Sequence, residues 1–301
     1  MLGSLRKEKP QFIGSMTALI TPFENGSLDI NSFKKIVNHQ IENGTDGLIP
    51  VGTTGESPTL SHDEHQKVVE VCIQESSGRV PIIAGAGSNS TKEASKLASH
   101  AGKAGADAVL VVTPYYNKPT QSGLYSHFMS VADAAKIPLI VYDIPGRSIV
   151  PVHDSTLVKL CENHELISGI KDATADISRP PRLLRLIGRG FSQLSGEDAT
   201  ALPYLAAGGH GCISVSSNIA PKLLAEMHDA WNNSNYNKAF ENHLKLINLH
   251  DAMFCESSPG PVKFAAERLG LCKSEARLPI VEIEDTSKAR VITALKECSL
   301  L

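Results

Sequence analysis

Short apolar runs that alternate with longer amphipathic segments constrain the fold of this sequence most strongly. Each run is too short for a helix and is bounded by Gly, Pro or polar residues, a pattern typical of β-strands. We expect eight strands, at residues 16–20, 48–51, 82–85, 108–113, 139–142, 167–171, 192–195 and 212–215. Strand–helix alternation repeated eight times over about 230 residues predicts an α/β fold, the (β/α)8 TIM barrel, which typically needs about 250 residues.

The starts of two helices can be read from their first residues. Ser61 and Ser90 each stand three residues before a glutamate, in the pattern of a capping box. In that motif the serine oxygen and the glutamate carboxylate each satisfy an unpaired backbone N–H group. We therefore expect helices after both serines, with Glu64 and Glu93 as the capping glutamates.

A doubly wound open sheet is the alternative fold. It would place G-x-G-x-x-G directly after the first strand, and no such sequence stands there. The glycine-rich residues 208–211 precede the eighth strand instead, where we expect a tight helix-to-strand turn. The barrel is therefore the favoured architecture.

The strand pattern stops after residue 234. Residues 235–254, 260–269 and 286–300 have helical patterns, with prolines between them. We therefore expect a catalytic barrel domain at residues 1–234 and a C-terminal helical domain at residues 235–301.

Composition narrows the class of protein. Lys and Arg number 29 against 32 Asp and Glu, so we expect no nucleic-acid partner and no membrane partner. No run approaches the ~20 apolar residues of a membrane span, and residues 1–11 lack the apolar core of a signal peptide. Six scattered cysteines without a CxxC pair indicate reduced thiols. The expectation is a cytoplasmic enzyme.

Lys171 is the sharpest candidate for a reactive group. It ends the sixth predicted strand, and period-two alternation places it on the same face as Ile167 and Gly169. Active sites of such barrels lie at the C-terminal ends of the strands. A partly desolvated amine there would be nucleophilic and would suit Schiff-base formation with a carbonyl substrate. The alternative is a structural lysine that pairs with the adjacent Asp172.

Hydroxyl groups stand at the ends of other predicted strands. Tyr142 ends one strand, Thr53 and Thr54 follow another, and Tyr116 lies just past a third. Imine formation must turn a carbinolamine hydroxyl into water, and phenol and alcohol groups relay protons without net charge. A single strand-end tyrosine is usually a core residue, but several hydroxyls around one lysine favour catalysis. Arg147 either binds a carboxylate through two parallel hydrogen bonds or is an ordinary surface arginine.

His62 and His65 raise the question of a metal site, because both lie on one face of a predicted helix. The zinc-binding helix uses H-E-x-x-H, in which the histidines are four residues apart, and no third ligand stands nearby. A pair at a helix start or a regulatory ligand site are the alternatives. We expect no metal.

Four segments together resemble the dihydrodipicolinate synthase/N-acetylneuraminate lyase family of class I aldolases. They are Gly52-Thr-Thr-Gly-Glu-Ser57, Tyr115-Tyr-Asn117, Tyr142-x-x-Pro-Gly-Arg147 and Gly169-Ile-Lys171. The resemblance extends from Ser15 into the C-terminal helices, and it implies a (β/α)8 barrel with a C-terminal helical domain. Asp143 departs from the asparagine that is frequent beside the tyrosine in this family.

The resemblance implies a role for each candidate. Lys171 would form the Schiff base with pyruvate, and Thr53, Tyr116 and Tyr142 would relay protons, with Tyr116 reaching across a dimer interface. Arg147 would receive the carboxylate of L-aspartate 4-semialdehyde. The residues that would line the bound pyruvate are Thr54, Gly196 and Ile213. The synthase branch joins these substrates on the route to lysine and diaminopimelate, and no cofactor is expected beyond the covalent imine.

The family also implies regulation and assembly. In its lysine-sensitive members L-lysine binds in a cleft at the dimer interface. The matching positions here are Ser57, Pro58, His62, His65, Asn89, Glu93 and Tyr115. Glu93 could pair with an ammonium group, and Asn89 could bond an amino or carboxylate group. A homotetramer, assembled as a dimer of dimers, is expected.

Other functions stay open at this point. A related pyruvate lyase, such as N-acetylneuraminate lyase or a 2-keto-3-deoxy sugar acid aldolase, is the nearest. The sialate lyases usually have serine at the position of Thr53 and lack an arginine at that of Arg147. A metal-dependent aldolase is disfavoured by the poor ligand set. A non-catalytic small-molecule sensor would be indicated if pyruvate formed no imine with Lys171.

Overall fold

The computed structural model describes residues 4–6 and 8–301. Residues 1–3 and Lys7, which fall in the predicted barrel domain and in the segment searched for a signal peptide, lie outside the described residues. The chain forms two compact units. The first unit holds residues 81–213 with the described residues up to 13, and the second holds residues 14–80 and 214–301.

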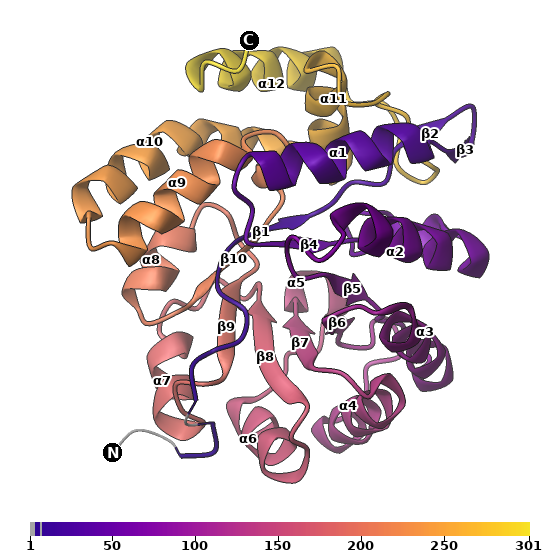
Figure 1. Ribbon diagram of the computed structural model, residues 1–301, viewed down its shortest axis with the longest axis vertical. Helices are drawn as coiled ribbons and strands as arrows, with labels where there is room; N and C mark the ends of the chain where they lie inside the picture. Colours follow the sequence, from indigo (N-terminus) through magenta and orange to yellow (C-terminus); the bar gives the residue numbers. More distant parts are fainter. Residues whose placement is uncertain (1–3, 7) are drawn as a thin grey trace. The chain divides into compact units, whose positions relative to one another are not determined.

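The first unit is built on a parallel sheet. Its described strands, in sheet order, are β5 (Ile83–Gly85), β6 (Ala108–Val112), β7 (Leu139–Asp143), β8 (Ile167–Asp172), β9 (Ser192–Ser195) and β10 (Gly211–Ser214, of which Ser214 belongs to the second unit). Its described helices are α3 (Thr91–Ala104), α4 (Gln121–Ala135), α5 (Pro145–Ser148), α6 (Asp154–Asn163), α7 (Arg179–Leu186) and α8 (Ala201–Ala206). As Figure 1 shows, α3 packs on β5 and β6, α4 on β7, and α6 on β8. Val109, Ile140 and Ile170 are fully buried, as is typical of parallel strands covered by helices.

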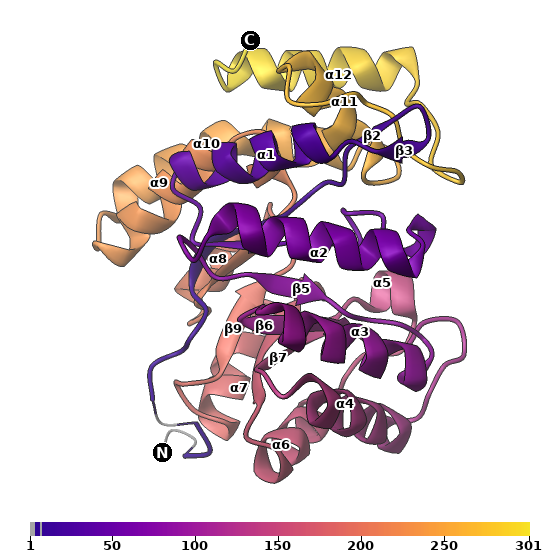
Figure 2. The ribbon, with the colours of Figure 1, turned by 45° about the vertical axis from the view of Figure 1, so that its right-hand side comes forward.

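The second unit combines two short strand pairs with long helices. β1 (Gly14–Ala18) pairs in parallel with β4 (Gly47–Ile49), and β2 (Phe23–Glu24) pairs in antiparallel with β3 (Ser27–Leu28). Its described helices are α1 (Ile30–Glu42), η1 (Ser57–Thr59), α2 (His62–Ser76), η2 (Ser216–Asn218), α9 (Pro221–Asn232), α10 (Tyr236–Met253), α11 (Gly260–Arg268) and α12 (Asp285–Glu297). In Figure 2, α9 lies against α10, and α12 lies over α10 and α11.

The order of these elements confirms the predicted fold class. Strands β1 and β4 to β10 pair in parallel, and each is followed along the chain by a helix. This is the (β/α)8 barrel followed by C-terminal helices. The glycine-rich residues 208–211 form the expected turn between α8 and β10, with Gly208 at φ +101°. A domain boundary at residue 234 would fall between α9 and α10, and it stays a prediction.

Some strand bounds differ from the expected ones, and one hairpin is unexpected. The strand expected at residues 16–20 lies at Gly14–Ala18. The strand predicted at residues 48–51 ends at Ile49, because Val51 takes a positive φ of 52° that no strand can include. The hairpin β2–β3 is present in the structure but is not among the predicted elements. Its turn residues Asn25 and Gly26 both have positive φ, and Asn-Gly is the strongest short-range signal of such a turn.

The two predicted capping boxes also differ. At Ser61 the box is complete, because the Glu64 carboxylate accepts the Ser61 N–H at 2.9 Å. At Ser90 the hydroxyl accepts the Glu93 N–H, but the Ser90 N–H donates to the Ser88 hydroxyl at 3.0 Å. The Ser88 hydroxyl in turn donates to the Glu93 carboxylate. A nearby serine therefore occupies the place that the capping box assigns to Glu93.

Candidate active site

Lys171 and Tyr142 face the same side of neighbouring strands. Tyr142 on β7 and Lys171 on β8 are register partners, and Asp143 and Asp172 are the next pair. Because side chains alternate along a strand, the amine and the phenol share one face and the two carboxylates share the other. The Lys171 Nζ lies 4.3 Å from the centroid of the Tyr142 ring, and Lys171 is only 5% exposed. A buried amine and a phenol thus lie together.

On the opposite face, one arginine binds both carboxylates. Arg179 begins α7 and is 3% exposed. Its Nη1 lies 2.7 Å from Asp143 Oδ2 and 3.5 Å from Asp172 Oδ1, and its Nε donates to Asp154 at 3.1 Å. The carboxylate of Asp172 is therefore engaged by Arg179, on the face away from Lys171.

Burial and charge act on this cluster in opposite directions. Burial raises the pKa of Asp143, and the Arg179 guanidinium offsets only part of that rise. Burial would lower the pKa of Arg179, but the charges of Asp172 and Asp143 raise it. Burial and the charge of Asp172 also raise the pKa of Tyr204. One guanidinium thus offsets part of the cost of burying the two carboxylates that follow Tyr142 and Lys171 in the chain.

The residue after β9 packs tightly against the lysine. Gly196 follows the strand directly, and a Cβ atom there would lie 3.2 Å from Lys171 Cε and 2.8 Å from Ala173 Cβ. Both distances are tighter than ordinary van der Waals contact, so a side chain at this position would displace its neighbours. Ile213, on β10, is fully buried.

Glu197 is a charged residue that the sequence analysis does not single out. Burial and the charge of Asp198 raise its pKa, while the charges of Lys171 and Arg147 lower it. Glu197 therefore lies within electrostatic reach of two candidate site residues. Its position just after a strand at the carboxyl end of the sheet is the signal that could have found it.

Arg147 and Tyr116 are both exposed. Arg147 lies on the short helix α5, directly after β7. Tyr116 is 89% exposed and has a positive φ of 70°, an uncommon conformation for a bulky residue. The tyrosine ring is therefore almost entirely open to solvent in this chain.

Three residues of the expected effector site lie together in the first unit. The backbone of Asn89 and the charge of Glu93 both act on the Tyr115 phenol, whose pKa is raised by burial first and by Glu93 second. The remaining expected positions belong to the second unit. Thr53 and Thr54 follow β4, Ser57 and Pro58 lie in η1, and His62 and His65 lie at the start of α2.

Residues 4–6 and 8–301 include no group of three His, Cys, Asp or Glu placed to hold a metal ion. Among the same residues, no helix has the length and apolar character to cross a membrane.

A buried lysine beside a phenol, at the carboxyl end of a parallel strand, is an arrangement that suits Schiff-base chemistry. The model of the dihydrodipicolinate synthetase family matches residues 11–298. The chain belongs to this family, and it is an enzyme of the lyase class.

Similar proteins support the assignment of the chain to this family. The chain is 55% identical to a 4-hydroxy-tetrahydrodipicolinate synthase of Bradyrhizobium diazoefficiens, over 97% of this chain and 99% of the relative. A dihydrodipicolinate synthase from Acinetobacter baumannii, solved as a complex with pyruvate, is 42% identical, with a TM-score of 0.93 over 96% of this chain and 99% of that one. A relative from Cyanidioschyzon merolae, solved with lysine bound, is 35% identical, with a TM-score of 0.94 over 97% of this chain and 100% of that one.

The Arg179 cluster generates a prediction about stability. Arg179→Leu should lower the free energy of unfolding by about 3–5 kcal/mol, because it leaves buried carboxylates unpaired. The double variant Asp143→Asn/Arg179→Leu should recover part of that loss, because one of the charges is gone. The loss should shrink as pH falls from 7 to 5, since an unpaired buried carboxyl has a raised pKa and the folded state then binds the proton. Urea unfolding at the two pH values measures both effects.

Arg182→Leu is the matched control. Arg182 lies one turn along α7, with 46% of its side chain exposed, and it pairs with Asp154 and Asp176. Exposed pairs contribute less than about 1 kcal/mol. Equal losses for the two arginine variants would contradict the proposed importance of the buried cluster.

Proposed function

We propose that this chain condenses pyruvate with L-aspartate 4-semialdehyde to form 4-hydroxy-tetrahydrodipicolinate, on the route to lysine and diaminopimelate. The observation that carries the proposal is the buried amine of Lys171 beside the Tyr142 ring, in a chain 55% identical to a synthase of that name. A partly desolvated amine is an effective nucleophile toward a ketone carbon.

The proposed chemistry runs through an imine. The Lys171 amine adds to the ketone carbon of pyruvate, and the carbinolamine hydroxyl leaves as water. Loss of a methyl proton gives an enamine, whose carbon attacks the aldehyde of the second substrate. The amino group of that substrate then displaces Lys171, which releases the cyclic product and restores the amine. The imine accepts the electron pair left by the methyl proton, and the aldehyde oxygen accepts the pair displaced when the enamine attacks, so the proposal includes no metal and no other cofactor.

We assign the proton transfers to Tyr142, Tyr116 and Thr53. The position of Tyr142 beside Lys171 supports the first assignment, and the resemblance of motifs supports the other two. Hydroxyl groups can pass protons between carbinolamine, imine and water without placing a charge in the site.

Substrate contacts complete the proposal. Thr54, Gly196 and Ile213 would line the bound pyruvate, and the tight space beside Gly196 supports its part in this role. Arg147 would bind the carboxylate of the semialdehyde, because an exposed guanidinium can form two parallel hydrogen bonds with a carboxylate.

Assembly and regulation are part of the same proposal. The 89% exposure of Tyr116 supports a dimer in which this ring enters the neighbouring copy, and a dimer of dimers would give the homotetramer. L-Lysine would bind at the set Ser57, Pro58, His62, His65, Asn89, Glu93 and Tyr115. The electrostatic link between Glu93 and Tyr115, the residue before Tyr116, supports a route from effector to relay.

The imine is tested by trapping. Incubation with pyruvate followed by borohydride should leave a stable adduct that peptide mass spectrometry locates at Lys171. Lys171→Arg keeps the positive charge but cannot form the imine, so it should lose the adduct and more than about 10³-fold in kcat. Lys103→Arg, an exposed lysine on α3, should retain both. An adduct on another lysine, or full turnover in Lys171→Arg, would rule the mechanism out.

Substrate choice is tested at Arg147. Arg147→Ala should raise KM for the semialdehyde far more than KM for pyruvate, because a charge-assisted contact contributes about 1.5–3 kcal/mol. Steady-state kinetics with each substrate varied in turn measures the two constants, with Arg185→Ala as a surface control. A larger effect on pyruvate would show that the assignment is wrong. Cleavage of N-acetylneuraminate by the wild-type chain would favour the sialate lyase alternative.

The shared tyrosine is tested by mixing inactive subunits. Tyr116→Phe and Lys171→Ala homo-oligomers should each have low activity. Mixed oligomers should recover part of the activity, because each mixed dimer can pair an intact lysine with an intact tyrosine from its neighbour. No recovery after demonstrated subunit exchange would argue that Tyr116 serves its own chain.

The effector is tested by titration with L-lysine. Saturating L-lysine should inhibit turnover, with a coupling of about 1–3 kcal/mol between effector and substrate. Glu93→Ala should weaken the inhibition while the uninhibited rate stays close to that of wild type. Lys92→Ala, which alters the neighbouring exposed residue, should leave inhibition intact. Absence of inhibition together with absence of lysine binding by calorimetry would remove the regulatory proposal alone.

A further inference from the structure

The loop that carries Thr53 and Thr54 has an unusual backbone. It connects β4 to η1, and both Val51 and Glu56 take left-handed conformations, with φ of 52° and 56°. A positive φ is a genuine outlier for a β-branched residue such as valine. Residues held in such conformations persist only where the surrounding structure fixes them. The contacts of this loop therefore decide its shape.

Both carboxylate oxygens of Glu56 are held by the C-terminal part of the chain. Glu56 is 3% exposed. Its Oε1 accepts a hydrogen bond from the Lys263 ammonium on α11, and its Oε2 accepts the backbone N–H of Arg277 at 2.9 Å. Within the loop, the Gly55 carbonyl accepts the Thr21 hydroxyl at 2.7 Å. The last residue of the loop is thus fixed from two directions.

Lys263 has no exposure of its own and serves this contact. Its Nζ also donates to the Glu275 carbonyl at 2.6 Å and lies 4.2 Å from the centroid of the Phe23 ring. Burial lowers the pKa of Lys263, and the charge of Glu56 opposes that shift. A fully buried ammonium with these partners is held in one position.

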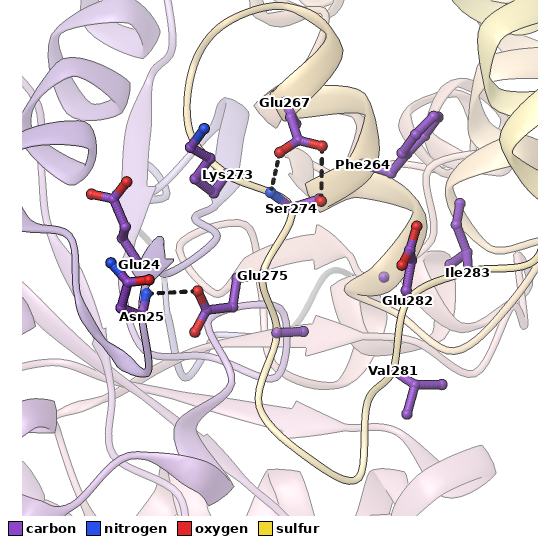
Figure 3. A pocket seen from close by; sticks show the side chains of 12 residues that line it. Glu24, Asn25, Phe264, Glu267, Lys273, Ser274, Glu275, Val281, Glu282 and Ile283 are labelled. Carbon is purple, nitrogen blue, oxygen red and sulfur yellow. Dashed lines mark hydrogen bonds between the residues drawn. The ribbon is translucent and has the colours of Figure 1, made fainter.

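Residues 275–277 tie the same region together. The Arg277 guanidinium binds both oxygens of Glu64, at 2.6 and 2.7 Å, and lowers the pKa of that carboxyl to about 2. Glu275 accepts the backbone N–H of Asn25 at 2.8 Å. Figure 3 shows this bond at the edge of a pocket of about 580 Å³, where Glu267 is engaged separately by Ser274. The segment is therefore anchored to the β2–β3 hairpin and to the start of α2.

We propose that Lys263, through Glu56, is a positioning residue that holds the Thr53–Thr54 loop in its catalytic shape. The C-terminal helices then set the geometry of a loop more than 200 residues earlier in the chain, since the hydrogen bond from Lys263 to Glu56 spans 207 residues. The inference rests on the proposed role of Thr53 in proton transfer. A buried ion pair that only stabilised the fold would have no special link to Thr53.

A double-mutant cycle between Glu56 and Thr53 separates these roles. Glu56→Gln keeps the size of the side chain and removes the charge that holds Lys263. It should lower kcat about 10²-fold, because the Thr53 hydroxyl is no longer held in place. In a Thr53→Val background, where the positioned hydroxyl is already gone, the same change should cost less than about threefold. Equal losses in both backgrounds would overturn the inference.

Hydrogen exchange gives a readout that does not depend on the reaction. Backbone amides of residues 51–57 should exchange faster in Glu56→Gln, while those of α10 stay protected. The charge-balanced variant Glu56→Gln/Lys263→Met should show the same faster exchange and the same loss of kcat, because it folds without an unpaired buried ion. Glu267→Gln, an exposed change on the same helix α11, should match wild type in both measurements. Unchanged exchange of the loop in both Glu56 variants would overturn the inference, whatever reaction the chain catalyses. Failure of the proposed function has a different sign, because the Lys171 adduct would then be absent from the wild-type chain.

Discussion

The alternation of side chains along β7 and β8 places the proposed nucleophile and two carboxylates on opposite faces. Tyr142 and Lys171 share one face, and Asp143 and Asp172 share the other, where Arg179 binds both carboxylates. If either strand slipped by one residue, a carboxylate would take the place of the amine or the phenol. The buried arginine therefore supplies a partner for both carboxylates on the face away from the proposed chemistry.

The sequence predicts the parts of this arrangement that depend on local patterns. Strand positions follow from short apolar runs. Period-two alternation places the Lys171 side chain on the same face as Ile167 and Gly169, so the burial of Lys171 is expected. Arg179 is different, because an arginine at a helix start is usually exposed and nothing nearby in sequence marks its three carboxylate partners. Glu197 is similar, since its environment is set by Lys171 and Arg147 on other elements.

The same distinction applies in the second unit. The Asn25-Gly26 turn is a local signal, so the hairpin β2–β3 could be predicted from the sequence. The early end of β4 could not, because no local pattern marks the left-handed conformation of Val51. The groups that bind Glu56, on Lys263 and Arg277, are likewise distant in the chain. The C-terminal helices thus do more than pack on one another, since they supply the groups that fix a loop of the proposed site.

The most direct test of the account observes the imine at equilibrium. Pyruvate labelled with carbon-13 at its ketone carbon, added to the wild-type chain, should give a protein-bound carbon resonance at the shift of an imine. That resonance should be absent with Lys171→Arg, which retains the charge but cannot condense. A spectrum that contains only the ketone and hydrate signals of unbound pyruvate, with saturating wild-type protein, would contradict the claim that Lys171 is the nucleophile.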